Sequence, residues 1–160
     1  MTDPVRPADP EALAIARRLI AEARFAALAV TDPATGLPAI SRIGVVPGPG
    51  GLPMALVSDL SQHTAALTSA PECALLIGEP GPSGDPLTHP RLSLNARAQF
   101  HRHGEPGHAE LAAHYVARQP KAKLYIGFGD FSILTFQPRD AFLNGGFGKA
   151  FTLTAADLTG

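Results

Sequence analysis

The sequence has 160 residues, 45% of them hydrophobic and 17% charged, which predicts a single globular domain with one core. The formal net charge of −1 gives no long-range field to attract polyanions, and no apolar run approaches the roughly 18 residues that cross a bilayer. Nucleic acids and membranes are therefore not expected as partners, and the acidic, proline-containing N-terminus is unlike a signal peptide. Cys73 is the only cysteine, so we expect no intramolecular disulfide, a buried unreactive thiol and a cytoplasmic location.

The first half of the chain alternates one helix with several short strands. Residues 1–8 are expected to form a flexible N-terminal arm, after which Asp9, Pro10 and Glu11 mark a helix start. The apolar periodicity then changes from helical to that of a buried strand at FAALAVT. The elements that follow are strands at 39–46 and 52–58, a short helix at 61–69 and a strand at 72–78.

The second half contains the clearest strand pattern. Residues 79–90 hold four prolines and two glycines and predict a long surface loop. Residues 91–103 alternate between apolar and polar side chains as far as His101, which predicts a long antiparallel strand with one polar face. A helix at 107–119, a strand at 131–136 and a glycine-rich turn at 144–148 complete the prediction.

Five or six short antiparallel strands with brief helices between them favour a closed β structure, either a barrel or a sandwich. The length and one-sidedness of the strand at 91–103 favour the barrel. We therefore predict a mainly β (α+β) fold: a six-stranded antiparallel split β-barrel with short flanking helices.

The stretch SDLSQHT, residues 58–64, is the best candidate site. Ser58 ends a predicted strand, and Ser61 precedes a helix whose first turn holds His63 and Thr64. Free N–H groups and the positive dipole end make a helix N-terminus suitable for an anion such as phosphate. Arg42, on the adjacent predicted strand, would add a planar five-donor counter-charge. Local sequence alone supports equally a strand end and a helix cap without a ligand, with Arg42 in solvent.

Six segments, in order along the chain, favour the ligand-binding interpretation over a helix cap without a ligand. They are SRIGVV at 41–46, LVSDLSQHTAAL at 56–67, PECALLIGEPG at 71–81, GDPLTHPRLSLNARA at 84–98, GFGDFSIL at 127–134 and NGGFGKA at 144–150. In these segments the chain resembles the FMN-binding split β-barrel family related to pyridoxamine 5′-phosphate oxidase, and it is most similar to the haem-utilisation branch.

The resemblance implies one FMN-binding domain over residues 1–160 and a homodimer with two FMN sites at its interface. It implies that Arg42, Ser58, Ser61, His63 and Thr64 bind the FMN phosphate. Asn95 stands where many relatives have glutamine and is expected to reach the edge of the flavin ring. Arg91, on the same face of the strand, is a further candidate.

Departures from the family narrow the expected activity. Vitamin-oxidising members carry a basic residue where His63 and Thr64 stand, and this chain has no tryptophan, so it is unlike a pyridoxamine 5′-phosphate oxidase. Haem-degrading relatives extend further at their C-terminus than Gly160. The leading hypothesis is an FMN-dependent oxidoreductase acting on a small molecule, with no side chain required as a catalytic group. The alternatives are a haem-binding or haem-degrading protein and a flavin-binding carrier or sensor without turnover.

Two other motifs give weaker evidence of function. His101 and His103 lie two residues apart, with His108 and His114 downstream, but no cysteine or carboxylate completes a familiar spacing, so no metal site is expected. GGFGK lacks the spacing and the hydroxyl residue of a phosphate-binding Walker loop.

Overall fold

The computed structural model describes residues 4–160 and begins its regular structure with a strand and a helix. Helix α1 spans Pro10–Glu22, and the Asp9 carboxylate accepts a hydrogen bond from the Ala12 N–H at 2.8 Å, as the sequence predicts. Its buried face presents Ala12, Ala16 and Ile20 to the core.

Six strands form the barrel, and all of their pairings are antiparallel. They are β2 (Phe25–Thr31), β3 (Pro38–Pro47), β4 (Pro53–Ser58), β5 (Glu72–Ile77), β6 (Arg91–His101) and β7 (Phe131–Asn144). Their order is β4-β3-β2-β5-β6-β7, and β7 closes the barrel because it pairs with both β6 and β4. The predicted six-stranded antiparallel barrel is confirmed.

Strand β7 is the largest departure from the predicted elements, since it continues eight residues beyond Phe136. The QPRD stretch that reads as a break is a β-bulge: Asn95 pairs with Asp140 and Ala96 with Pro138, which leaves Arg139 as the extra residue. A bulge is one of the few places where a strand tolerates proline, because proline donates no hydrogen bond to the ladder. The strand at 91–103, by contrast, ends early, at His101.

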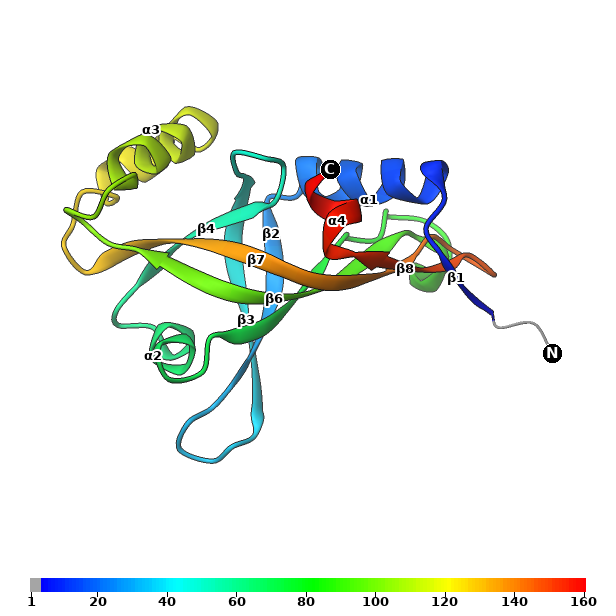
Figure 1. The fold of residues 1–160 in the computed structure, drawn as a ribbon, viewed down its shortest axis with the longest axis horizontal. Helices are drawn as coiled ribbons and strands as arrows, with labels where there is room; N and C mark the ends of the chain where they lie inside the picture. Colours follow the sequence, from blue (N-terminus) through cyan, green and yellow to red (C-terminus); the bar gives the residue numbers. More distant parts are fainter. Residues whose placement is uncertain (1–3) are drawn as a thin grey trace.

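Two further strands and a helix lie beside β7 (Figure 1). Strand β8 (Ala150–Thr154) pairs with β7, and β1 (Val5–Pro7) runs parallel to β8. Part of the expected N-terminal arm at 1–8 is therefore a strand, whereas residues 1–3 lie outside the described part of the chain. Helix α4 (Ala155–Thr159) follows β8 and starts with a capping box between Thr154 and Asp157.

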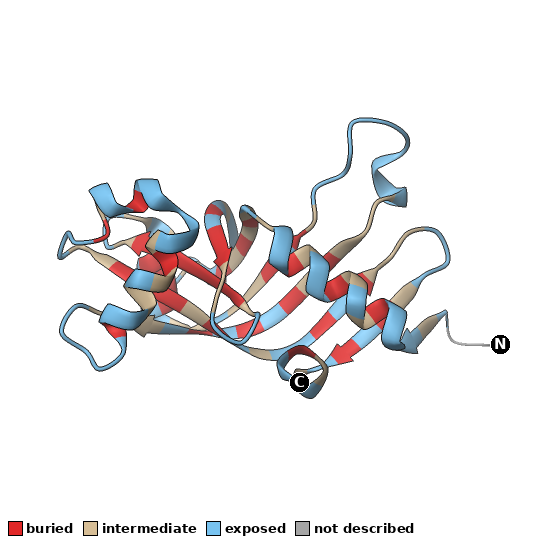
Figure 2. Ribbon diagram, turned by 90° about the horizontal axis from the view of Figure 1, so that it is seen from above, coloured by how far each residue is buried: buried red, intermediate tan, exposed pale blue. Residues whose placement is uncertain are grey.

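The remaining helices flank the barrel: α2 (Gln62–Ser69), α3 (His108–Arg118) and two short 3₁₀ segments, η1 (Pro86–Thr88) and η2 (Pro120–Leu124). The main core fills the barrel with residues such as Leu28, Leu94 and Phe136. A second cluster lies under α3 and η2, where Tyr115 packs with Met54 and Ile133. Buried residues recur along most of the helices and strands, with exposed helix surfaces outside (Figure 2).

The loop from 79 to 90 is closed by a tight contact at its two ends. Gly78 has a φ of 112°, and a Cβ there would lie 2.7 Å from the carbonyl oxygen of Pro90. Only glycine avoids both the strain and the clash at this position. The β5–β6 ladder, which pairs Ile77 with Leu92, brings the two ends of the loop this close together.

Candidate functional site

Strands β3 and β4 part soon after they meet. Their ladder consists of Val45 with Ala55, Val46 with Met54 and Pro47 with Pro53. Beyond it, residues 38–44 pair only with β2, and Leu56–Ser58 pair only with β7, among the ladders of residues 4–160. Two facing strand edges thus keep backbone hydrogen-bonding groups that no neighbouring strand uses.

Arg42 and Ser58 lie on these two edges and on the same face of the sheet. If the ladder continued, its register would place Gly44 opposite Leu56 and Arg42 opposite Ser58. Even-numbered residues of both strands point to the outer face of the barrel, as Val46 and Met54 do beneath α3. The barrel therefore opens where the sequence predicted a counter-charge and a hydroxyl.

The start of α2 lies beside the projecting β2–β3 hairpin (Figure 1). Ser61 is the N-cap residue, but its side chain makes no capping hydrogen bond. The first-turn N–H groups of Gln62 and His63 precede any possible intrahelical partner. The His63 Nδ1 lies 3.2 Å from the Ser41 Oγ, which joins the helix start to β3.

Ser58 and Thr64 are already hydrogen-bonded. The Ser58 Oγ donates to the Asp130 carboxylate at 3.2 Å and accepts from the Leu60 N–H at 3.2 Å. The Thr64 hydroxyl is 3% exposed and donates to the Ser58 carbonyl oxygen at 2.6 Å, so its visible role is to join α2 to the end of β4. An anion at Ser58 must displace Asp130, a residue that sequence reasoning did not single out.

Two cavities flank β3. The first, of about 590 Å³, lies on the outer face between β2, β3, the end of α1 and the residues after β5. The second, of about 410 Å³, lies between the hairpin and the start of α2 and is lined by Ser61 and His63. Both cavities are lined in part by Ile40 and Ser41, so they adjoin at that point of β3.

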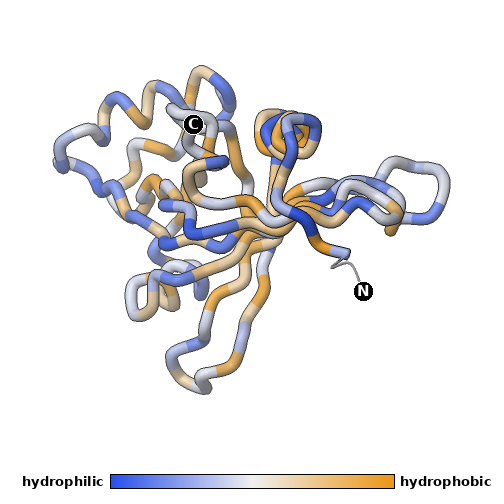
Figure 3. Tube along the Cα trace, turned by 45° about the vertical axis from the view of Figure 1, so that its right-hand side comes forward, coloured by the Kyte–Doolittle hydropathy of each residue, from blue (hydrophilic) through white to orange (hydrophobic). Residues whose placement is uncertain are grey.

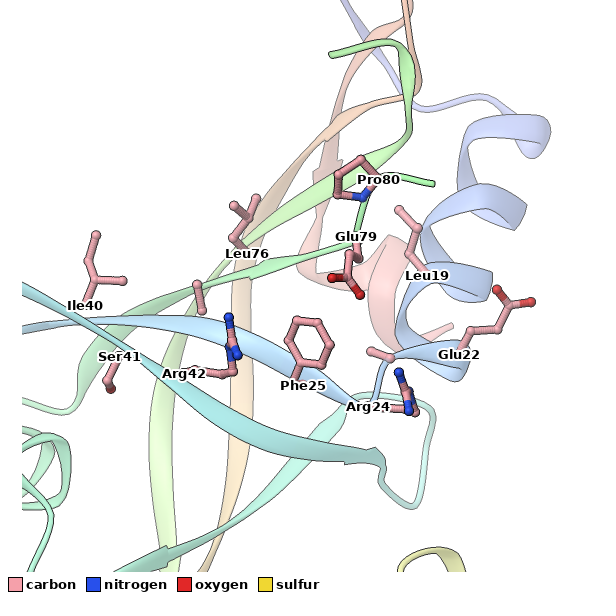
Figure 4. Close-up of a pocket in the computed structure, with 13 residues that line it drawn as sticks. Leu19, Glu22, Arg24, Phe25, Ile40, Ser41, Arg42, Leu76, Glu79 and Pro80 are labelled. Carbon is pink, nitrogen blue, oxygen red and sulfur yellow. The ribbon is translucent and has the colours of Figure 1, made fainter. Parts of the chain in front are cut away.

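Arg42 belongs to the first cavity and His63 to the second. Figure 4 shows the Arg42 and Ser41 side chains pointing to opposite sides of β3. The Arg42 guanidinium lies 5.3 Å from the centre of the Phe25 ring and has no ion pair or hydrogen bond among the described residues. The structure thus brings Ser61 and His63 together but leaves Arg42 on the neighbouring face.

Arg42 and Arg24 both line the first cavity, and neither forms an ion pair among the described residues. Burial lowers the pKa of the His63 imidazole, which favours the neutral ring at neutral pH. An unpaired guanidinium on one side of β3 and an uncapped helix start on the other are two features that each favour an anionic ligand.

Asn95 and Arg91 lie away from both cavities. Asn95 is on the outer face, three strands from β3, and its Nδ2 donates to the Asp140 carboxylate at 2.7 Å. The Arg91 guanidinium donates to the carbonyl oxygens of Leu87 and His89 and so secures the loop before β6. One chain does not bring these two residues to Arg42.

Two other polar groups, a thiol and a phenol, keep their protons at neutral pH. Burial, with a smaller contribution from Glu72, raises the pKa of the half-buried Cys73 thiol to about 11. Burial also raises the pKa of Tyr115 to about 12, so its phenol is protonated. Among residues 4–160, no helix has the length and apolar character needed to span a bilayer.

Solved structures share this fold over nearly the whole chain. One is 39% identical, with a TM-score of 0.85, and the match covers 97% of this chain and 99% of that one. The heme binding protein from Mycobacterium smegmatis is 27% identical, with a TM-score of 0.83 and 95% of this chain covered. This chain spans 61% of the Mycobacterium protein's own length.

A more distant match shows the fold alone. It is a protein from Clostridium acetobutylicum related to general stress protein 26, of the pyridoxinephosphate oxidase family, with 13% identity and a TM-score of 0.69. The match covers 94% of this chain and 99% of that one. No family model and no curated protein sequence matches the chain.

Barrel topology and structural neighbours define a split β-barrel protein. The chain shares this split β-barrel fold with the heme binding protein from Mycobacterium smegmatis and with the pyridoxinephosphate oxidase-family protein from Clostridium acetobutylicum.

Proposed function

We propose that this chain binds FMN and acts as an FMN-dependent oxidoreductase on a small organic substrate. The observation that carries the proposal is the parting of β3 and β4 between an unpaired Arg42 and the uncapped start of α2. A phosphate monoester is a dianion that needs several N–H or O–H donors and a counter-charge. The described residues supply both.

The donor set fits a phosphate as follows. Ser61 and the first N–H groups of α2 are free to donate, and Arg42 supplies the positive charge from the outer face of β3. Ser58 can join only if its hydroxyl leaves Asp130, and Thr64 acts through its hydrogen bond to the Ser58 backbone. His63, as a neutral ring, contributes a hydrogen bond rather than a charge.

FMN supplies the redox chemistry when it is bound. The task of the protein is to hold and orient the ring and to exclude water. The free edges of β3 and β4 offer backbone groups for the polar rim of a flavin, and the Phe25 ring offers an apolar surface in the first cavity. A cytoplasmic location suits the lone Cys73, for which the chain offers no partner.

We propose further that the site is completed in a homodimer. The outer face exposes large apolar side chains: Ile40 is 75% exposed, Leu76 49% and Phe142 39%. Strand register places Leu76 in one row with Arg42 and Phe142, through Ala27 and Ser93. A second copy covering this face would exclude water from the row and bring its own Asn95 or Arg91 toward Arg42.

Haem is the second candidate ligand, and His63 favours it. A neutral imidazole with its Nδ1 held by Ser41 has a free Nε2 on a ring that lines the second cavity, which is the state in which histidine ligates iron. The similarity to the heme binding protein of Mycobacterium smegmatis adds support. A flavin carrier without turnover is the remaining alternative.

Absorption spectroscopy of the purified protein separates these candidates. Bound FMN gives paired bands in the blue and near-ultraviolet, whereas bound haem gives a Soret band. Calorimetric titrations with FMN, riboflavin and haem then rank the ligands, and bleaching of the bound flavin by a reduced substrate under anaerobic conditions distinguishes an enzyme from a carrier. A colourless protein that takes up no added FMN contradicts the proposal.

Light scattering tests the proposed homodimer. The dimeric mass is expected for the protein in solution, and Ile40→Arg should reduce it toward the monomer because it places a charge among the exposed apolar side chains of the outer face. Arg97→Ala, at an exposed position on the same face, is the control and should leave the mass unchanged.

A further inference from the structure

Histidines lie at both ends of α3. At its first turn, His108 is 8% exposed and its ring centre lies 4.3 Å from that of His103, with the planes tilted by 41°. His101, at the end of β6, bonds the Thr135 hydroxyl through Nε2 at 2.7 Å. At the other end, the His114 Nε2 lies 2.8 Å from the Pro47 carbonyl oxygen.

The contacts of His114 indicate the tautomer of its neutral ring. Arg118 can only donate, and its Nη1 lies 3.1 Å from the His114 Nδ1, so this nitrogen accepts. The proton of the neutral ring is therefore on Nε2, which donates to Pro47.

The surroundings of His108 oppose protonation of its ring. Burial lowers the pKa of His108, and the neighbouring His103 and His101 lower it further, while Glu105 raises it. Arg102 adds a positive charge nearby, partly countered by Asp59 at 3.7 Å and hydrogen-bonded to Ser132 at 3.3 Å.

These contacts hold a unit that covers apolar surface. Helix α3 and the η2 segment after it bury Tyr115 and Ile126 against Met54 and Ile133. They belong to the second cluster, which is smaller than the barrel core. Separating α3 and η2 from the barrel should therefore cost less free energy than opening the barrel itself, which stays closed.

We propose that His108, packed against the His103 ring, forms a pH-sensitive latch: its neutral ring holds α3 and η2 on the outer face, and its protonation releases both segments. The direction follows from linkage, because a histidine whose pKa is lowered by docking takes up its proton more readily when undocked. Docking is therefore complete above the ordinary histidine value of about 6.5 and is lost as the pH falls below it.

Release would change the region where β3 and β4 part. Gly44 lies on the free edge of β3, and a Cβ there would be 3.9 Å from the Tyr115 hydroxyl. Undocking α3 removes Tyr115 from this edge and exposes the apolar surface beneath it. The latch itself depends only on α3 and does not require that FMN or haem binds.

The two tyrosines report on the latch directly. Tyr115 and Tyr125 are the only tyrosines, the chain has no tryptophan, and both tyrosines pack in the second cluster. Their near-ultraviolet circular dichroism should fall between about pH 8 and about pH 5. The far-ultraviolet signal should retain its β-sheet character, because the barrel remains folded. A near-ultraviolet signal that stays constant over this range overturns the proposal, as does simultaneous loss of both signals.

A variant pair isolates the histidines responsible. His103→Gln removes an exposed ring beside His108, and it should shift the midpoint of the tyrosine transition to lower pH. His89→Gln, in the loop before β6, is the matched control and should leave the midpoint unchanged. Equal midpoints in His103→Gln and the unaltered protein would contradict the latch. Hydrogen exchange, corrected for intrinsic pH dependence, should rise at acid pH by about tenfold or more in 108–124 and not in β6.

Discussion

The β6–β7 and β3–β4 pairs are neighbours in one barrel but use their backbones differently. Every residue of β6 pairs with β7, through the bulge at Asn95 and Ala96. Strand β3 has nearly the same length, yet it meets β4 only at Val45–Pro47. Both pairs have an apolar inner face, which packs into the same core.

The difference separates what stabilises the barrel from what is free to bind. Where the ladder is complete, backbone groups are satisfied and side chains only pack. Where it is open, edge groups stay available, and polar residues such as Arg42 and Ser61 gather beside them. Mutations in the two regions should therefore affect different measurements.

The closed region should show the largest effect. Phe136 is 2% exposed inside the barrel, and Phe136→Ala should lower the free energy of unfolding by about 3–5 kcal/mol, because it leaves a cavity that the barrel cannot fill. Urea denaturation followed by far-ultraviolet circular dichroism measures the change. Leu76→Ala, on the outer face of β5, should cost about 1 kcal/mol or less in the monomer. Equal losses would show that the inner and outer faces pack alike.

The open region should respond in ligand affinity rather than in stability. Arg42→Ala should weaken FMN binding by about 1–3 kcal/mol, because the phosphate loses its charge-assisted partner. Calorimetric titration with FMN and with riboflavin measures the change. Only FMN should be affected, since riboflavin lacks the phosphate. Unchanged FMN affinity would mean that Arg42 serves another ligand.

The exposed ion pair between the regions should matter least. The Arg97 Nη1 on β6 lies 2.6 Å from the Glu72 Oε1 on β5, and the two side chains are 57% and 66% exposed. Glu72→Gln should change the free energy of unfolding by between about 0 and 1 kcal/mol, because solvent and salt screen such pairs. The change should shrink further in high salt. A larger loss that salt does not reduce would indicate a structural role for Glu72.

Pattern reasoning recovers most of the barrel because its strands alternate cleanly or are bounded by turn residues. Strand β6 is the clearest case, since its inner residues follow one another at every second position. Only the first part of strand β7 is predicted, because Pro138 interrupts its pattern. Pairing with the partner strand is what reveals that the interruption is a bulge. Strand β1 has three residues and no pattern of its own; it exists through pairing with β8.

The site is predicted in part for a similar reason. Ser61 and His63 are local to one helix start, so their neighbourhood follows from the sequence, and the alternation of β3 correctly gives the face of Arg42. Asp130 becomes a neighbour of Ser58 only through the β4–β7 ladder, 72 residues along the chain. Assignment of Asn95 and Arg91 to the same site depends on a second copy, which one chain's pattern does not contain.

The close approach of Gly78 to Pro90 leaves the sequence and length of the loop between them free to vary. Because the ends of this loop touch each other rather than depend on what lies between them, the residues between could be lengthened, shortened or exchanged without moving β5 or β6. The same barrel could in this way carry a different rim around its outer-face cavity, which Glu79 and Pro80 help to line. Changes of ligand preference among proteins of this fold would then arise in the loop while the strands stay as they are.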